Sequence, residues 1–183
     1  MKKLKIVVLI ILFPLLARAQ SETTEALQKQ YNDAFSLYFY KNTLRMLNQM
    51  DSPEFDDLIK DIEKMKFLMI DKSKVKFASS DYKKLLKDYS AEAYEEIMTT
   101  RYQGKNFDIY LKDKKGSTLG TVMLVNDSTS LYVLDILGTI DVSKATQLFS
   151  TLDESSDIGK KIKSFLDSDG SYDKKREFRI HNQ

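Results

Sequence analysis

The feature that most constrains the fold is a run of period-two segments in the second half of the chain. Four stretches carry apolar residues at alternate positions or on both faces, and short polar turns such as Lys114–Ser117 and Asn126–Thr129 separate them. Alternation with a period of two is typical of β-strands, and short turns join strands that run antiparallel. The sequence therefore predicts about four antiparallel strands, at residues 94–103, 105–113, 118–126 and 130–138.

The first half of the chain predicts two more strands, at 34–40 and 65–71, and several helices. The clearest helix signal lies in residues 51–65, where Ser52 is a good N-cap, Pro53 suits the first helical position, and an apolar stripe follows. The stripe is Phe55, Leu58, Ile59 and Ile62. Further helices are expected at 41–50, 80–90, 142–152 (capped by Asp141) and 158–166. The order favours an α+β fold, a mostly antiparallel β-sheet with helices packed on one face.

The strand at 105–113 shows the cleanest alternation. It predicts that Phe107, Ile109 and Leu111 point inward and that Asp108, Tyr110 and Lys112 point outward. Gly120 falls within the next strand, where glycine marks a bulge or a close backbone approach.

The first 19 residues match a secretory signal peptide. Three lysines precede an apolar run from Ile6 to Leu16, which is too short to span a bilayer comfortably. Ala17-Arg18-Ala19 then provides an A-x-A cleavage site. The alternative is an uncleaved N-terminal anchor. Gln20 stands where a lipoprotein would carry its cysteine, and the chain has no cysteine, so we expect a periplasmic or secreted product without a stable membrane anchor.

Removal of 19 of the 183 residues leaves 164, enough for one domain with its own core. We expect a linker or a loose helix at 20–33, around Leu27 and Tyr31, a single domain at 34–167 and a flexible tail at 168–183. The leader holds four of the 29 basic residues and no acid, so the remainder has 25 basic and 27 acidic residues. That balance, with interleaved signs, argues against nucleic-acid binding.

Several segments in this order resemble a family of small secreted bacterial proteins catalogued as domain of unknown function 4252. They are "TLRMLNQM" (Thr43–Met50), "LMI" (Leu68–Ile70), "YEEIMTTR" (Tyr94–Arg101), the hairpin "FDIYLKDKKGSTLGTVMLVN", and "LYVLDILGTIDVSKATQL", where a strand ends in Gly138 before a helix. The resemblance covers roughly residues 34–150. It implies bacterial export and an α+β fold, and it transfers no activity and no functional residue.

The composition argues against most common catalytic and metal-binding sites. Catalysis by cysteine is excluded, and the one histidine, His181, lies near the C-terminus, so neither a Ser-His-Asp triad nor a zinc cluster is predicted. Residues 167–178 suggest a calcium loop, but neither register of Gly170 supplies the ligands. We expect no catalytic residues, no metal and no cofactor.

Two features remain as functional candidates. Asp135 lies inside an apolar strand, where burial would raise its pKa for acid–base work; the simpler interpretation is an outward or ion-paired carboxylate. Tyr38, Tyr40 and Tyr110 are expected on faces opposite the core, where they would form a recognition patch or close over the sheet edge as half-buried rings. The sequence thus favours a non-enzymatic envelope domain that binds a protein, peptide or glycan, with a carboxylate-dependent hydrolase or transferase as the alternative.

Overall fold

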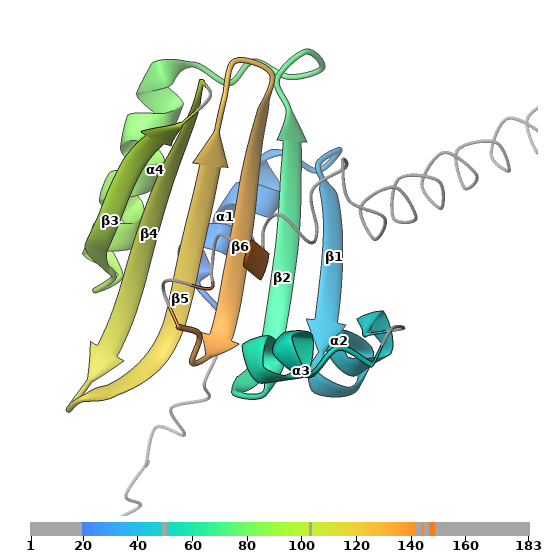
Figure 1. Cartoon of the computed structure of the whole chain (residues 1–183). Helices are drawn as coiled ribbons and strands as arrows, with labels where there is room; N and C mark the ends of the chain where they lie inside the picture. The colour runs from blue at the N-terminus through green and yellow to red at the C-terminus, as the bar shows by residue number, and fades with distance from the viewer. Residues whose placement is uncertain (1–19, 49–50, 103, 142–143, 145–146, 149–183) are drawn as a thin grey trace, which may run out of the picture.

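The protein is built on a six-stranded antiparallel sheet with the strand order β1-β2-β6-β5-β4-β3 (Figure 1). The computed structural model describes residues 20–48, 51–102, 104–141, 144 and 147–148. Its strands are β1 (Phe35–Tyr40), β2 (Ile62–Asp71), β3 (Glu95–Tyr102), β4 (Lys105–Lys114), β5 (Ser117–Asn126) and β6 (Ser130–Gly138). The helices are α1 (Glu22–Gln30), α2 (Lys41–Leu47), α3 (Pro53–Ile59) and α4 (Ser79–Ala91). The predicted α+β class is confirmed.

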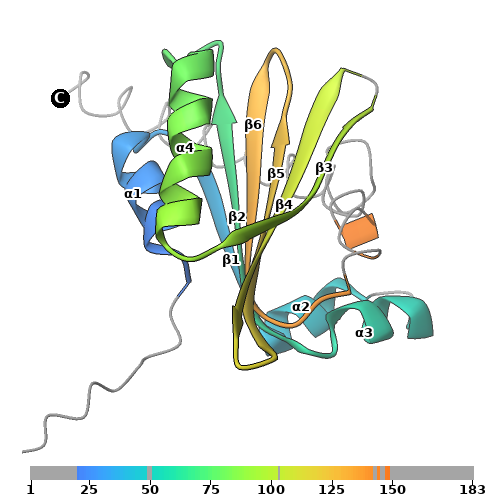
Figure 2. The same cartoon turned by 90° about the vertical axis from the view of Figure 1, so that its left-hand side faces the viewer.

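The helices were expected on one face of the sheet, but they are divided between its two faces (Figure 2). One face packs against α1 and α4, and its core contains Leu27, Leu68, Leu85 and Val133. The other face packs against α2 and α3 at one end of the strands, and its core contains Leu44, Leu58 and Leu134. Because both faces are covered, the central strands are apolar on both sides, which explains the near-continuous hydrophobic runs of β5 and β6.

Helix α3 begins where its caps predict and ends earlier than its apolar stripe predicts. The Ser52 hydroxyl accepts a hydrogen bond from the Phe55 N–H at 3.3 Å, and Pro53 occupies the first turn. Ile62 was expected in the same helical stripe, but it opens β2 and pairs with Gly138. Spacing alone cannot separate these outcomes, since an apolar residue three positions on suits both elements. Ile62 belongs to β2 because β6 lies beside it and pairs with it.

Two glycines mark close backbone approaches. Gly138 has φ +111°, and a Cβ there would lie 2.3 Å from the carbonyl oxygen of Asp61, so only glycine fits without rearrangement. At Gly120 a Cβ would meet the Tyr94 hydroxyl at 3.1 Å, and the β4–β5 register shifts directly beside it. Of the two alternatives expected for Gly120, the close approach is found at the residue itself, and the register shift lies next to it.

The N-terminal segment is the largest correction. Residues 20–33 were expected as a linker or a loose helix around Leu27 and Tyr31. The helix is found, but it is regular and packed, with Leu27 buried and a buried Tyr31 after it. It covers the sheet beside α4 and is part of the fold rather than a linker. The sequence of α1 shows no clear helical period of apolar residues, because the helix has few of them and polar side chains make many of its contacts. The predicted helix at 158–166, the tail at 168–183, the calcium-loop segment and His181 lie outside the described residues, as does most of the helix expected at 142–152.

Candidate functional site

One row of side chains crosses all six strands and contains most of the predicted candidates. The register pairs Tyr38 with Lys66, Lys66 with Asp135, and Asp135 with Val122. Val122 pairs with Tyr110, and Tyr110 pairs with Glu96. Directly paired residues point to the same face of a sheet, so this row lies on the face that α1 and α4 cover. Tyr38, Asp135 and Tyr110 thus share a face, which the sequence could not indicate.

Tyr110 is buried, and the prediction that it faces outward is wrong. Its side chain is 2% exposed and its ring stacks on Tyr89 of α4 with 5.9 Å between centroids. Its hydroxyl donates to Glu96 at 3.2 Å, and burial, followed by the charge of Glu96, raises the pKa of Tyr110. Asp108, also expected outward, accepts hydrogen bonds from Tyr82 and Thr99. The alternation in β4 correctly separated its side chains into two faces of the sheet. Helix α4 covers the second face, so the residues expected outward are buried there.

Tyr38 and Tyr40 are exposed as predicted, at 39% and 58%. They stand two residues apart on β1, which is an edge strand. Lys64 of β2 places its Nζ 5.4 Å from the Tyr38 ring centroid and 5.5 Å from that of Tyr40, within the range of a cation–π interaction. The Tyr38 hydroxyl donates to Gln28 of α1 at 2.9 Å. We call Tyr38, Tyr40 and Lys64 the β1 rim; it is a preorganised aromatic and cationic surface.

Asp135 is sealed in the interior, 1% exposed. The expectation that it faces outward is therefore wrong. Its Oδ2 accepts a hydrogen bond from the Ser21 N–H at 2.9 Å, and its backbone carbonyl accepts one from the Gln20 side-chain amide at 3.2 Å. The residues just before α1 thus lie directly over this carboxylate. A substrate would reach Asp135 only if Gln20 and Ser21 moved away.

Burial raises the pKa of Asp135 to about 6, because the low-polarity surroundings disfavour the charged form. Hydrogen bonds from Thr24 and Ser21 and the charge of Lys66 act in the opposite direction, and the charge of Glu92 adds to the rise. The pKa of the carboxyl group thus lies about two units above that of a free aspartate. That property suits acid–base chemistry, but the carboxylate lacks access to solvent.

Lys66 is a fully buried cation beside Asp135 in the row. Its Nζ is 2.6 Å from Glu25 Oε1 of α1 and 4.9 Å from the ring centroid of Tyr38. A buried lysine without a partner would lose its charge or destabilise the fold, so the pair ties α1 to β2. Lys66 thereby joins the sealed part of the row to the β1 rim.

Glu92, just after α4, caps the start of α1. Its carboxylate accepts hydrogen bonds from the Ser21 hydroxyl at 2.7 Å, the Thr23 N–H at 3.0 Å and the Glu22 N–H at 3.1 Å. Lys112 Nζ lies 3.5 Å away. Burial alone would raise the pKa of Glu92, but these hydrogen bonds outweigh it and the pKa is lowered. A carboxylate is favourable there because a helix N-terminus carries partial positive charge.

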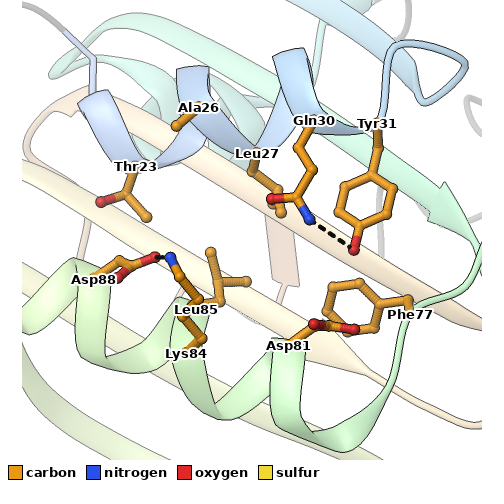
Figure 3. A pocket seen from close by; sticks show the side chains of 10 residues that line it. All are labelled: Thr23, Ala26, Leu27, Gln30, Tyr31, Phe77, Asp81, Lys84, Leu85 and Asp88. Carbon is orange, nitrogen blue, oxygen red and sulfur yellow. Dashed lines mark hydrogen bonds and ion pairs between the residues drawn. The ribbon is translucent and has the colours of Figure 1, made fainter.

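Between α1 and α4 the structure leaves a cavity of about 70 Å³ (Figure 3). Leu27 and Leu85 point toward one another across it, with Tyr31 and Phe77 at one end. Small-molecule sites usually occupy roughly 300–1,000 Å³, so this gap is too small for such a ligand. It supplies no cleft beside Asp135.

Lys66 and Glu92 were not among the residues expected from the sequence. Lys66 lies in "MKFLMI", where a lysine between apolar residues was a signal that its side chain is paired or exposed at an edge. Glu92 had no signal, because its role depends on α1 arriving from 70 residues away. Among the described residues no group of three or more His, Cys, Asp or Glu could hold a metal ion.

These observations define a class of protein: a small α+β domain whose six-stranded sheet carries a sealed charged cluster under its first helix and an aromatic rim at one edge. The chain belongs to the family described as domain of unknown function (DUF4252), whose model matches residues 29–148. The resemblance noted from the sequence is thus confirmed. No curated protein and no solved structure matches the chain. In the described part of the chain, no helix has the length and apolar character needed to cross a membrane.

Proposed function

We propose that the chain is an exported, non-enzymatic domain of the cell envelope that binds a protein, peptide or glycan partner through the β1 rim. One contrast supports this function best. Tyr38 and Tyr40 are exposed on an edge strand and held by Lys64, whereas Asp135, the residue best suited to acid–base work, is sealed. Exposed aromatic side chains with polar tips are enriched at recognition surfaces.

An extended peptide fits this edge best among the three partner types. Within the described residues β1 pairs with β2 alone, so every second residue of β1 points its N–H and C=O away from the sheet. A peptide can add to such an edge as a further strand, with side chains of the domain flanking it. Tyr38 and Tyr40, two residues apart, project to the same side about 7 Å from one another.

Export is supported by the leader pattern and by the Ala17-Arg18-Ala19 site. Expression of the full chain in its bacterial host, followed by N-terminal sequencing of the envelope fraction, tests this part. A protein that begins at Gln20 is expected. One that begins at Met1 and stays in the cytoplasm contradicts export.

Binding is tested by capture of envelope components on the immobilised domain. We expect the wild-type domain to retain a partner and the double variant Tyr38→Ala/Tyr40→Ala to lose at least tenfold in affinity. Tyr102→Ala is the matched control: Tyr102 is 64% exposed, on β3 at the opposite edge. A wild-type domain that captures nothing, or a control that loses as much as the double variant, contradicts a role for the rim.

The alternative, a hydrolase or transferase that uses Asp135, has less support because Gln20 and Ser21 cover the carboxylate. Asp135→Asn tests it. We expect partner capture to persist in this variant, and a loss of any measured cellular activity with capture intact would favour the enzyme.

A further inference from the structure

Gln20 and Ser21 are held against Asp135 from two sides. The Gln20 amide binds the Asp135 carbonyl, and the Ser21 N–H binds the Asp135 carboxylate at 2.9 Å. Successive backbone nitrogens are at most about 4 Å apart. The backbone nitrogen of Gln20 therefore lies within about 7 Å of Asp135 Oδ2.

The charges around Asp135 do not balance. The charges of Lys66 and Glu92 act on Asp135, and with their own partners they make a chain of three carboxylates, Glu25, Asp135 and Glu92, and two lysines. Lys66 pairs with Glu25, and Lys112 pairs with Glu92. Asp135 is left without an ion-pair partner within the described part of the chain, although it is the most deeply buried of the three. One further positive charge beside Asp135 would balance the negative charge of its carboxylate.

Cleavage of the leader would create that charge at this place. Hydrolysis of the Ala19–Gln20 bond adds water: Ala19 gains a carboxylate, and Gln20 gains an α-amine. An α-amine has an unperturbed pKa of about 7.7–8.0, so it is mostly protonated at neutral pH. A group with one N–H becomes a cation with three donors. An acceptor is also free beside it, because the buried Oε1 of Gln20 has no hydrogen-bond partner among the described residues.

We propose that Asp135 and Glu92, which both bind the backbone or side chains at the start of α1, hold the α-ammonium group of Gln20, so that leader removal completes an ion pair with Asp135. The inference rests on the export and cleavage proposed above. Leader removal would then stabilise the fold as well as release the chain. The precursor would lack this ion pair until it is cut.

The helix dipole of α1 opposes a cation at this end, with about half a unit of positive charge. Two carboxylates outweigh it, since Glu92 accepts three hydrogen bonds from this helix end and Asp135 accepts a fourth. The balance therefore favours the charged amine.

The ion pair has a defined pH window. The charged and titratable groups that act on Asp135 or are acted on by it are Lys66 of β2, Glu92 after α4, Tyr89 of α4 and Tyr94 before β3. Glu25 of α1 pairs with Lys66. Burial raises the pKa of both tyrosines above their usual value, so they stay neutral. The pair forms above the pKa of Asp135 and is lost as pH rises through that of the amine, which the carboxylate raises above about 8.

Three forms of the chain test the proposal by thermal unfolding from pH 4 to 10. One begins at Gln20 with a free amine, one is the same chain with an acetylated amine, and one begins at Ala19. At pH 7 we expect the free form to melt about 3–6 °C above the acetylated form. The Ala19 form should be intermediate or equal to the acetylated form, and the difference should vanish below about pH 4.

Two controls make the result specific. In Asp135→Asn, the free and acetylated forms should melt within about 1 °C of one another. N-terminal glutamine can also cyclise with loss of ammonia to a neutral lactam, which mass spectrometry detects. A parallel series with Gln20→Ala, which cannot cyclise, should keep the difference between free and acetylated forms.

Equal melting of the free and acetylated forms at pH 7, in both series, overturns the ion pair. A difference that persists in Asp135→Asn overturns the assignment to this carboxylate. These outcomes are independent of export. N-terminal sequencing that finds Met1 in the cell overturns the cleavage on which the inference rests, whereas a chain that begins at Gln20 and shows no melting difference overturns the inference alone.

Discussion

The two faces of the sheet are both covered by helices, but different kinds of contact hold them. On the α2/α3 face the buried side chains that meet are almost all apolar, such as Met65, Leu134 and Ile136. On the α1/α4 face, Lys66, Asp135 and Asp108 are buried among the apolar residues. Apolar burial is non-directional, whereas buried charges need partners in fixed geometry. The first face supplies stability, and the second also fixes where α1 and α4 sit.

The largest test concerns the apolar face. Leu134→Ala should lower the free energy of unfolding by about 2–5 kcal/mol through lost burial and a residual cavity, and the loss should be the same at pH 4.5 and pH 7.5. Urea denaturation measures it. Leu131→Ala is the matched control, on the same strand and also 0% exposed but facing α1 and α4. A loss that depends on pH at Leu134 would contradict the division between the faces.

The second test concerns the charged face. The pKa of Asp135 is raised to about 6 by burial, above its unfolded value of about 3.9. The folded state then binds the proton more tightly, so this contribution is complete below pH 4 and is lost as pH rises through 6. In the acetylated chain, which lacks the amine, stability should fall by about 3 kcal/mol across this range.

Asp135→Asn is the control for that pH profile, because it keeps an acceptor for the Ser21 N–H and removes the titration. Its stability should change little from pH 4 to 6 apart from other groups shared with the wild type. A wild-type profile that rises over this interval would show that the carboxylate is not held in a desolvated site.

Glu92 lies in the same cluster as Asp135, but its contribution to stability changes with pH in the opposite direction. Hydrogen bonds from α1 lower its pKa, so its contribution is present above about pH 4.3 and is lost as pH falls through the folded value. Glu92→Gln should cost about 1 kcal/mol at pH 7 and less at pH 3. Hydrogen exchange in α1 should show faster opening of that helix. Unchanged exchange there would contradict the capping role.

The smallest expected effect on stability lies at the β1 rim. Tyr40→Ala should change the free energy of unfolding by no more than about 0.5 kcal/mol, while it weakens partner capture. Tyr110→Ala is the instructive control, since the same substitution at a buried ring should cost about 3–5 kcal/mol. If both variants lost equal stability, the assignment of Tyr40 to a surface would be wrong.

Most elements of this fold were predictable from local patterns. Period two located the strands, and Ser52-Pro53 located the start of α3. The errors at α1, Tyr110 and Asp108 share one cause. Helices cover the second face of the sheet, and no local sequence pattern indicates that this face is covered. Asp135 was identified as a candidate from its apolar neighbours, but its orientation follows from strand register, which depends on partners more than 60 residues away.

By itself the sequence determined the antiparallel strands, the turns between them, the absence of cysteine chemistry and the leader pattern, because each depends on neighbouring residues or on composition. Only the tertiary structure decided that Lys66, Asp135, Val122 and Tyr110 share one row, that α1 and Glu92 close over it, and that Tyr38 and Tyr40 remain outside. These facts depend on long-range pairing and on the two-sided covering of the sheet. A buried charge is stabilised by its neighbours in space, and the sequence does not list them.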